Sequence, residues 1–358
     1  SEPPSAEPAL ALLPRAPPLG RLQLLNVLVA RNEAFRSGLT LPAAAELLGA
    51  EAIEAIEAGR DARVLLHAGN LFYNVLHSAL RGPLAAELPS ALERGLFRAF
   101  LRGYFAGFDP QSGEDEALVW VVGALRELAG SALPGFSAVA LCLRALPAER
   151  REVFAEMLVQ LVDAVVRARS AHSLVADAPA ALAREHPEVF GESAAPDFAL
   201  SMADVHALSG LVRDWPAQPT ALVNAALKVL VDVTFIGGYN PPLQRALSTG
   251  EGGEALLRAL AGLLAAVSAE PELATNCLRL AANLVHANPA AQTFVLDAGL
   301  LRAFLARTAR TEEDPHAKEV IVVFVRYMTE GSERAREAIA ALKLGDFVTE
   351  NANFMKKV

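Results

Sequence analysis

The sequence predicts an all-α protein, and in particular an armadillo/HEAT-like right-handed α-solenoid of stacked helical repeats. Apolar residues make up 53% of the chain and aromatic residues only 6%, with much of the excess in the helix formers Ala and Leu. Val and Ile seldom alternate with polar residues, as a half-buried strand would require. Similar helical segments also recur at a spacing of about 40–47 residues, which is typical of armadillo and HEAT proteins.

The chain divides by composition into a tail and one long helical region. The tail, residues 1–20, holds six prolines and lacks the basic and apolar regions of a secretory signal, so we expect it to be disordered. Residues 21–358 are predicted to form a single α-solenoid. It comprises N-terminal repeats over 21–170, an irregular, proline-containing connection over 170–200, and C-terminal repeats over 201–358.

Helical spacing and helix-end residues locate the elements of the N-terminal half. Gly59 is a plausible helix stop and Asp61 a plausible start. Pro147 followed by Glu149 and Glu152 suits the beginning of a long helix, because Pro fits the first position and acids favour the helix dipole. The predicted helices are 21–36, 41–59, 61–80, 117–130 and 147–169, with shorter helical pieces around 95–107 and 136–146.

The C-terminal third has the clearest helix boundaries. Ser201 is placed as a capping-box residue and Thr220 opens the next helix. Pro289 starts a short helix that ends at Gly299. The run VIVVFV resembles a strand by propensity, but we assign it to a helix because its flanks keep helical spacing. The predicted helices here are 221–235, 272–288, 289–299, 300–310 and 316–331, followed by SERAREAIAALK.

Two segments far apart in the chain repeat one another. GLFRAFL at 95–101 matches GLLRAFL at 299–305 in six of seven positions. The preceding helices share an Asn-x-x-His pattern, as Asn74/His77 and Asn283/His286. In a solenoid each repeat covers an apolar face of its neighbour, so equivalent apolar positions recur. We therefore expect Arg98 and Arg302, inside the repeated phrase, to face solvent.

Charge and cysteine content exclude several classes of function. The formal net charge is −9. Binding to nucleic acid or to an anionic membrane surface usually needs a basic surface patch, so both functions are disfavoured. No apolar stretch of membrane-spanning length is free of charges and helix breakers. The two cysteines, Cys142 and Cys277, lie in apolar helical runs and are interpreted as buried thiols in a reducing compartment.

No motif in the sequence predicts catalysis, a cofactor or a metal. The acidic run Glu312-Glu313-Asp314 with His316 could suggest a metal site, but it precedes a helix, where capping and solvation explain it better. The Gly-rich GEGGE at 250–254 lacks the preceding strand and following Lys-Ser/Thr of a phosphate-binding loop. We therefore predict no enzyme activity and no cofactor.

Long third helices of armadillo-type repeats line a concave surface, where an Asn can hydrogen-bond the backbone of an extended peptide. Alignment of the repeats places polar residues at the equivalent positions, and their mixed chemistry argues against one regular peptide ladder. An open alternative is that these residues cap or bridge neighbouring repeats. The predicted groove residues are Asn74, His77, Asp232, Asn283, His286 and Arg326.

The segment CLRLAANLVHANPAAQTFVLDAGLL…EDPHAKEVIVVFVRYMTEGSERARE, within 276–343, resembles the C-terminal domain of the ataxin-10 family, and the terminal NFMKKV is similar to the end of that family. Asp314-Pro315 stands for the family's acid-Asn-Pro element without the Asn, and Arg326-Tyr327-Met328 replaces its Arg-Asn-Leu. The resemblance implies an armadillo-type solenoid without catalytic activity. It also implies cytoplasmic roles in protein–protein interaction, linked to cytokinesis, cilia and neuronal survival.

We therefore predict a noncatalytic scaffold that binds other proteins in the cytoplasm, with the cilium, centrosome or cytoskeleton as candidate associations. The partners' identity is open, and a second copy of the chain is one candidate. The alternatives are a transport receptor or small-GTPase regulator of the same architecture and, less favoured, a helical enzyme or metalloprotein. A transport receptor would favour a regular Trp/Asn ladder, whereas only Trp120 and Trp215 occur.

Overall fold

The computed structural model contains α-helices and short 3-10 helices over the residues it describes, which are 17–31, 52–53, 55–56, 62–81, 96–109, 115–130, 137–167, 202–235, 241–267, 270–305 and 315–342. No strand occurs within these ranges, so the all-α prediction is confirmed there. The chain forms two compact units. One comprises residues 1–179 and 196–204, and the other residues 180–195 and 205–358.

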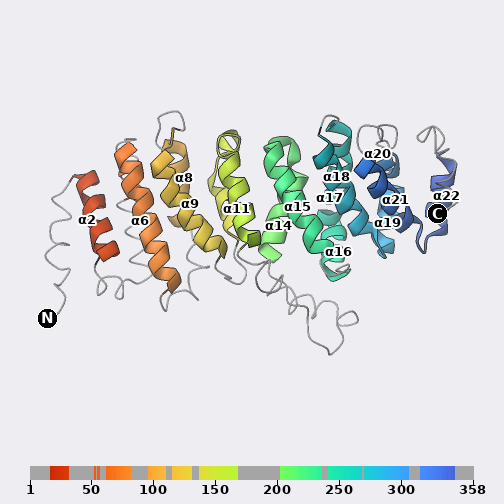
Figure 1. The fold of residues 1–358 in the computed structure, drawn as a ribbon, viewed down its shortest axis with the longest axis horizontal. Coiled ribbons are helices and arrows are strands. Elements are labelled where there is room, and N and C mark those ends of the chain that lie inside the picture. Colours follow the sequence, from red (N-terminus) through yellow and green to blue (C-terminus); the bar gives the residue numbers. More distant parts are fainter. Residues whose placement is uncertain are drawn as a thin grey trace, which may run out of the picture. The chain divides into compact units, whose positions relative to one another are not determined.

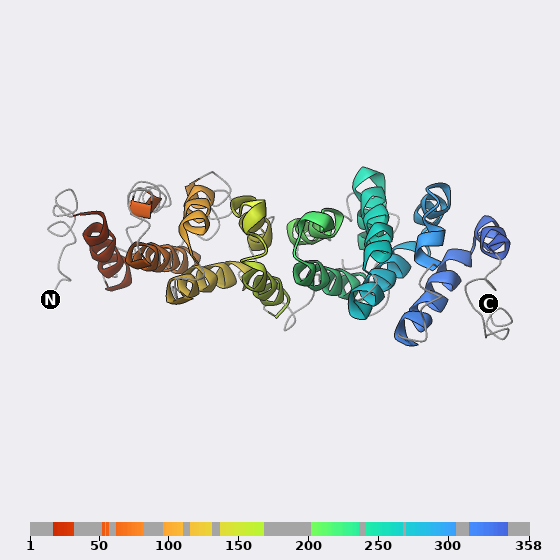
Figure 2. The ribbon, with the colours of Figure 1, turned by 90° about the horizontal axis from the view of Figure 1, so that it is seen from above.

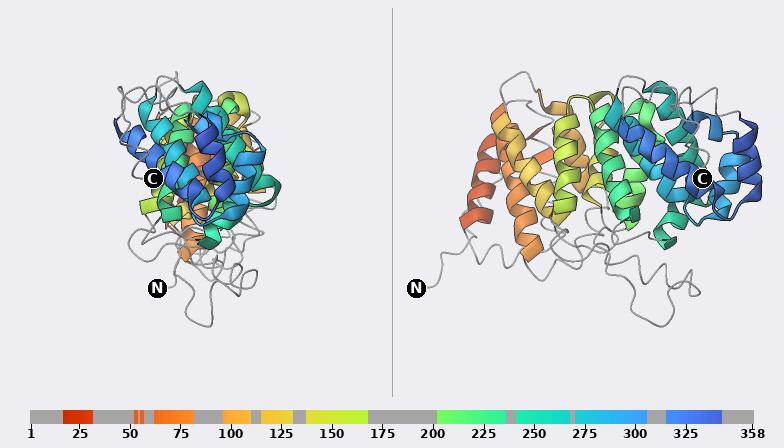
Figure 3. Two further views of the ribbon diagram at one scale, coloured as in Figure 1. Left: turned by 90° about the vertical axis from the view of Figure 1, so that its right-hand side faces the viewer. Right: turned by 45° about the vertical axis from the view of Figure 1, so that its right-hand side comes forward.

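In the first unit, successive long helices lie side by side in a row (Figures 1 and 3). This row is formed by α2 (Pro18–Arg31), α6 (Ala62–Arg81), α9 (Asp115–Gly130) and α11 (Ala155–Arg167). A second layer contains α8 (Leu96–Gly107) and α10 (Ala138–Ala145), which pack on each other (Figure 2). We call the helices of such a row the row helices.

The second unit has the same two-layer arrangement (Figure 2). Its row helices are α15 (Thr220–Phe235), α18 (Pro271–Val285) and α21 (Pro315–Thr329), and each packs on the next. The other helices are α14 (Met202–Arg213, in this unit from Val205 on), α16 (Pro241–Ser248), α17 (Gly250–Ala266), α19 (Pro289–Asp297), α20 (Leu301–Leu305) and α22 (Glu333–Ala341), with a 3-10 turn at Trp215–Ala217.

Aromatic side chains form the centre of the first unit. The ring of Phe100 in α8 stacks on Phe72 in α6 with their centroids 4.8 Å apart. Phe105 of α8 meets Phe154 at 4.9 Å. All four side chains are buried, so they fix the second layer onto the row helices through the removal of large apolar surfaces from water.

The repeated phrase occupies second-layer helices in both units. GLFRAFL falls largely in α8 and GLLRAFL includes α20. Phe304 of the second copy is buried against Phe324 of α21, with ring centroids 5.0 Å apart, as Phe100 is buried against α6. Arg98 and Arg302 are both exposed, as predicted.

Most predicted helix starts and ends agree with the structure to within a few residues. Thr220 is the first residue of α15 and Pro289 the first of α19, where the Asn288 side chain accepts a hydrogen bond from the Ala291 amide at 3.3 Å. Gly299, with φ of 68°, follows the end of α19 in the left-handed conformation that glycine adopts without steric cost. VIVVFV is helical within α21, as predicted.

Two predicted boundaries are wrong. The helix expected from residue 21 begins at Pro18, inside the range assigned to the tail, because Pro is well suited to the first helical position. The helix expected over 147–169 begins only at Ala155, after a 3-10 turn at Ala148–Arg150 and further turn residues.

Contacts of two arginines explain the late start of α11. The guanidinium of Arg150 donates to the carbonyl oxygen of Phe108, beyond the end of α8, and that of Arg151 donates to the carbonyl of Leu143 in α10. These carbonyls lie at helix ends, where partners within the helix are lacking. The turn residues before α11 therefore carry the two arginines that bind these carbonyls.

Some predictions fall outside the described residues. They concern the tail residues 1–16, most of helix 41–59 with Gly59, the caps at Asp61 and Ser201, the connection over 170–200, and the acidic run 312–314.

Candidate functional site

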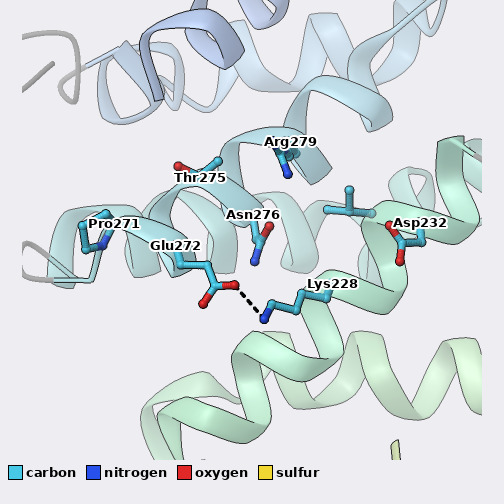
Figure 4. A pocket seen from close by; sticks show the side chains of 8 residues that line it. Lys228, Asp232, Pro271, Glu272, Thr275, Asn276 and Arg279 are labelled. Carbon is cyan, nitrogen blue, oxygen red and sulfur yellow. Dashed lines mark ion pairs between the residues drawn. The ribbon is translucent and has the colours of Figure 1, made fainter. Parts of the chain in front are cut away.

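A polar groove lies between the exposed faces of two consecutive row helices, α15 and α18 (Figure 4). Its volume is about 480 Å³. The lining residues are Lys228, Val231, Asp232, Pro271, Glu272, Thr275, Asn276 and Arg279. Lys228 and Asp232 are one helical turn apart on α15, and Glu272, Asn276 and Arg279 follow at spacings of four and three on α18. Both sets therefore line one face of their helix.

Hydrogen bonds across the groove fix its polar side chains. Lys228 Nζ lies 2.6 Å from a carboxylate oxygen of Glu272, an ion pair drawn in Figure 4. The Asn224 amide donates to the other Glu272 oxygen at 3.2 Å. The Asn276 amide donates in turn to the Asn224 side-chain oxygen at 2.9 Å. Because Asn276 is buried and Glu272 exposed, the network runs from the joint between the helices out to solvent.

The two carboxylates of the groove have different electrostatic environments. The hydrogen bond and positive charge of Lys228 lower the pKa of Glu272, with a smaller contribution from Asn224. Desolvation within the groove raises the pKa of Asp232, and the positive charge of Arg279 opposes that shift. The negative charge of Asp232 is therefore less well compensated than that of Glu272.

Of the six residues predicted to line a groove, Asp232 lines the groove between α15 and α18, and the other five do not. Asn283 is on the same pair of helices but is 7% exposed. Its amide nitrogen donates to the carbonyl of Val231 at 3.2 Å and to the hydroxyl of Thr234 at 3.0 Å, joining α18 to α15. In this structure Asn283 bridges neighbouring helices, which is the alternative that the sequence left open.

The two histidines of the Asn-x-x-His pattern have equivalent positions. Each contacts the next row helix: His77 of α6 contacts Glu127 of α9, and the ring of His286, after α18, meets Tyr327 of α21 with centroids 4.4 Å apart. Burial lowers the pKa of His286; the nearby Glu330 carboxylate opposes this shift and Arg326 adds to it.

The remaining predicted residues do not join the groove. The amide of Asn74 donates to Asn70 of its own helix at 2.6 Å. Arg326 is exposed on α21. Asn74 and His77 belong to the first unit, and the other four residues to the second. The structure thus distributes the six residues over separate locations.

Sequence reasoning missed Lys228, Glu272, Asn276 and Arg279. A signal was present, because these charged and amide residues recur at spacings of three, four or seven within helices that were predicted to line a concave surface. Alignment on Asn283 selected one position per helix and overlooked the rest of the polar stripe.

The groove offers paired opposite charges and amides, a set of donors and acceptors that suits the main chain and polar side chains of a peptide. Within the described ranges, no three or more His, Cys, Asp or Glu side chains are grouped so that they could hold a metal ion. Cys142 and Cys277 are both buried and are not joined in a disulfide, as predicted. The described helices include none that could span a membrane.

Comparison with known proteins confirms the C-terminal resemblance. Residues 273–356 match the family described as the Spinocerebellar ataxia type 10 protein domain. This match includes α18 from Leu273 on, and with it the groove residues Thr275, Asn276 and Arg279 but not Glu272. No curated protein matches the chain. Among solved structures, an engineered protein, Northeast Structural Genomics Consortium Target OR329, shares 14% identity over 91% of this chain and 97% of its own, with a TM-score of 0.30.

Proposed function

We propose that this chain is a noncatalytic helical-repeat adaptor of the ataxin-10 type, which binds an extended segment of a partner protein along its row helices. In this proposal each unit is part of an armadillo/HEAT-like right-handed α-solenoid. The match at residues 273–356 and the packing of α15, α18 and α21 in chain order support it. The adaptor is proposed to act in the cytoplasm, as the family resemblance implies.

The observation that carries the proposal is the polar groove between α15 and α18. An extended peptide presents unpaired main-chain amides and carbonyls, and affinity for it depends on side chains that can both donate and accept. Lys228, Arg279 and Asn276 supply donors, while Glu272 and Asp232 supply acceptors, all from two rigid helices. Side chains on rigid elements bind with a smaller loss of entropy than those on loops.

Charge reversal in the groove tests this function. The Arg279→Glu variant should capture at least about tenfold less of the proteins that the wild-type chain captures from the native source. A partner's acidic group that faces Arg279 would then face a second negative charge. Arg302→Glu makes the same change at an exposed position on α20, outside the groove, and should capture the same proteins as the wild type. Partners retained equally by both variants contradict the groove assignment.

A further inference from the structure

The first unit carries a row of rings on α6 and α9, outside the groove between α15 and α18. The ring centroids of Trp120 and Tyr73 are 5.4 Å apart, and those of Tyr73 and His77 are 5.5 Å apart. The Tyr73 hydroxyl donates to Glu127 at 3.1 Å, and His77 Nδ1 lies 2.9 and 3.0 Å from the two Glu127 oxygens. The three rings and the Glu127 carboxylate therefore form one continuous cluster of contacts.

Gly123 of α9 lies beside the Tyr73 ring. A Cβ atom there would lie 3.5 Å from two carbons of the Tyr73 ring. The ring therefore rests directly on the α9 backbone between Trp120 and Glu127, which are seven residues apart and lie on the same face of the helix. At this distance the Cβ atom of an alanine would make ordinary van der Waals contact with the Tyr73 ring.

The row is partly accessible from solvent and contains one carboxylate. The His77 and Glu127 side chains are 26% and 33% exposed. Val119, which precedes Trp120 in α9, is 63% exposed. His77 Nδ1 faces both oxygens of the Glu127 carboxylate, which is the acidic group of this cluster.

We propose that this row, Trp120, Tyr73, His77 and Glu127, is a second interaction surface that binds an arginine side chain of a partner protein. A guanidinium stacks on aromatic faces through cation–π attraction, and its donors complement a carboxylate. Val119 offers contact for the apolar stem of the arginine. The surface is in the first unit, so it stands or fails independently of the groove between α15 and α18.

The fluorescence of Trp120 can report this binding directly. The chain has two tryptophans, and Trp215→Phe leaves Trp120 as the only one. The probe is a nine-residue Gly/Ser peptide with three arginines, and its control carries citrulline at the same places. The arginine peptide should give a saturable change in Trp120 emission, and the citrulline peptide should bind at least about threefold more weakly, because it lacks the charge needed for cation–π attraction.

Two variants and a matched control complete the test in the same background. Glu127→Gln should weaken arginine-peptide binding by about threefold, whereas Glu156→Gln, which removes one exposed negative charge from α11, should not. Val119→Lys adds a cation at an exposed position, leaves the ring contacts intact, and should also weaken binding. Equal binding of the two peptides, or wild-type affinity in both Glu127→Gln and Val119→Lys, overturns the proposal.

Discussion

Replacement of Gln292 by Leu should destabilise the second unit, because this buried side chain joins the ends of two row helices. Gln292 is 3% exposed. Its amide nitrogen donates to the carbonyl of Val285, the last residue of α18, at 3.1 Å and to that of Tyr327, near the end of α21, at 2.8 Å. Both carbonyls lie in the last turn of a helix, where partners are lacking within the helix.

The expected loss of stability depends on which hydrogen bonds each carbonyl keeps after the substitution. Val285 keeps a hydrogen bond from the Asn288 amide at 3.3 Å, so the loss there is one ordinary hydrogen bond, about 1 kcal/mol. The Tyr327 carbonyl loses its Gln292 donor at 2.8 Å, which costs about one more ordinary hydrogen bond, again about 1 kcal/mol. Leu has a similar size, so the cavity contribution is small. We expect the free energy of unfolding to fall by about 2 kcal/mol.

Urea unfolding followed by Trp215 fluorescence measures this change, since Trp215 lies in the second unit. The background variant Trp120→Phe removes the signal of the first unit. Thr293→Leu is the matched control, because its exposed position introduces the same side chain without breaking these bonds, and its effect should stay within about 0.5 kcal/mol. A Gln292→Leu variant as stable as Thr293→Leu would refute the reasoning.

Three further predictions concern titration, reactivity and packing. Because the pKa of His286 is lowered in the folded state, the unfolded chain binds a proton more readily. The resulting stability is present above a pH of about 6.5 and is lost as the pH falls below it. Urea unfolding from pH 7.5 to 5 should therefore show a smaller loss of stability for His286→Gln than for the wild type. Burial raises the pKa of the Cys142 thiol, so thiol labelling should be slow until urea unfolds the first unit, and rapid labelling of the folded chain would contradict this burial. Gly253→Ala places a Cβ 2.2 Å from the backbone carbon of Ser248 and should lower the melting temperature, with a cost of about 1–3 kcal/mol. Gly252→Ala in the same helix meets only the end of a flexible arginine and should not lower it.

Helix type and many helix ends could be predicted because they depend on local chemistry. Pro289 and Gly299 act through their own backbone preferences, so the sequence around them is sufficient. The late start of α11 could not be predicted in this way. It depends on carbonyls of residues 108 and 143, whose positions are set only after α8 and α10 have folded against the row helices.

The site was harder to predict than the fold because a helix presents successive residues at different angles. The alignment paired His77 with His286 as groove residues, and in the structure each contacts the next row helix. It also selected Asn283, which the packing turns toward Thr234 and away from solvent. Which Asn faces a neighbour and which faces the groove depends on the rotation of each helix, and hydrophobic packing in three dimensions sets that rotation.

Site-specific photo-cross-linking tests the central claim most directly. A benzophenone side chain would replace Asp232 in the groove and, in a second protein, the exposed Arg302 on α20. Irradiation of each protein with native-source extract, followed by mass spectrometry, identifies what lies within reach. We predict that position 232 cross-links a defined extended segment of a partner protein and that position 302 does not. The same products from both positions, or none from position 232 while partners are still captured, would contradict binding in the groove between α15 and α18.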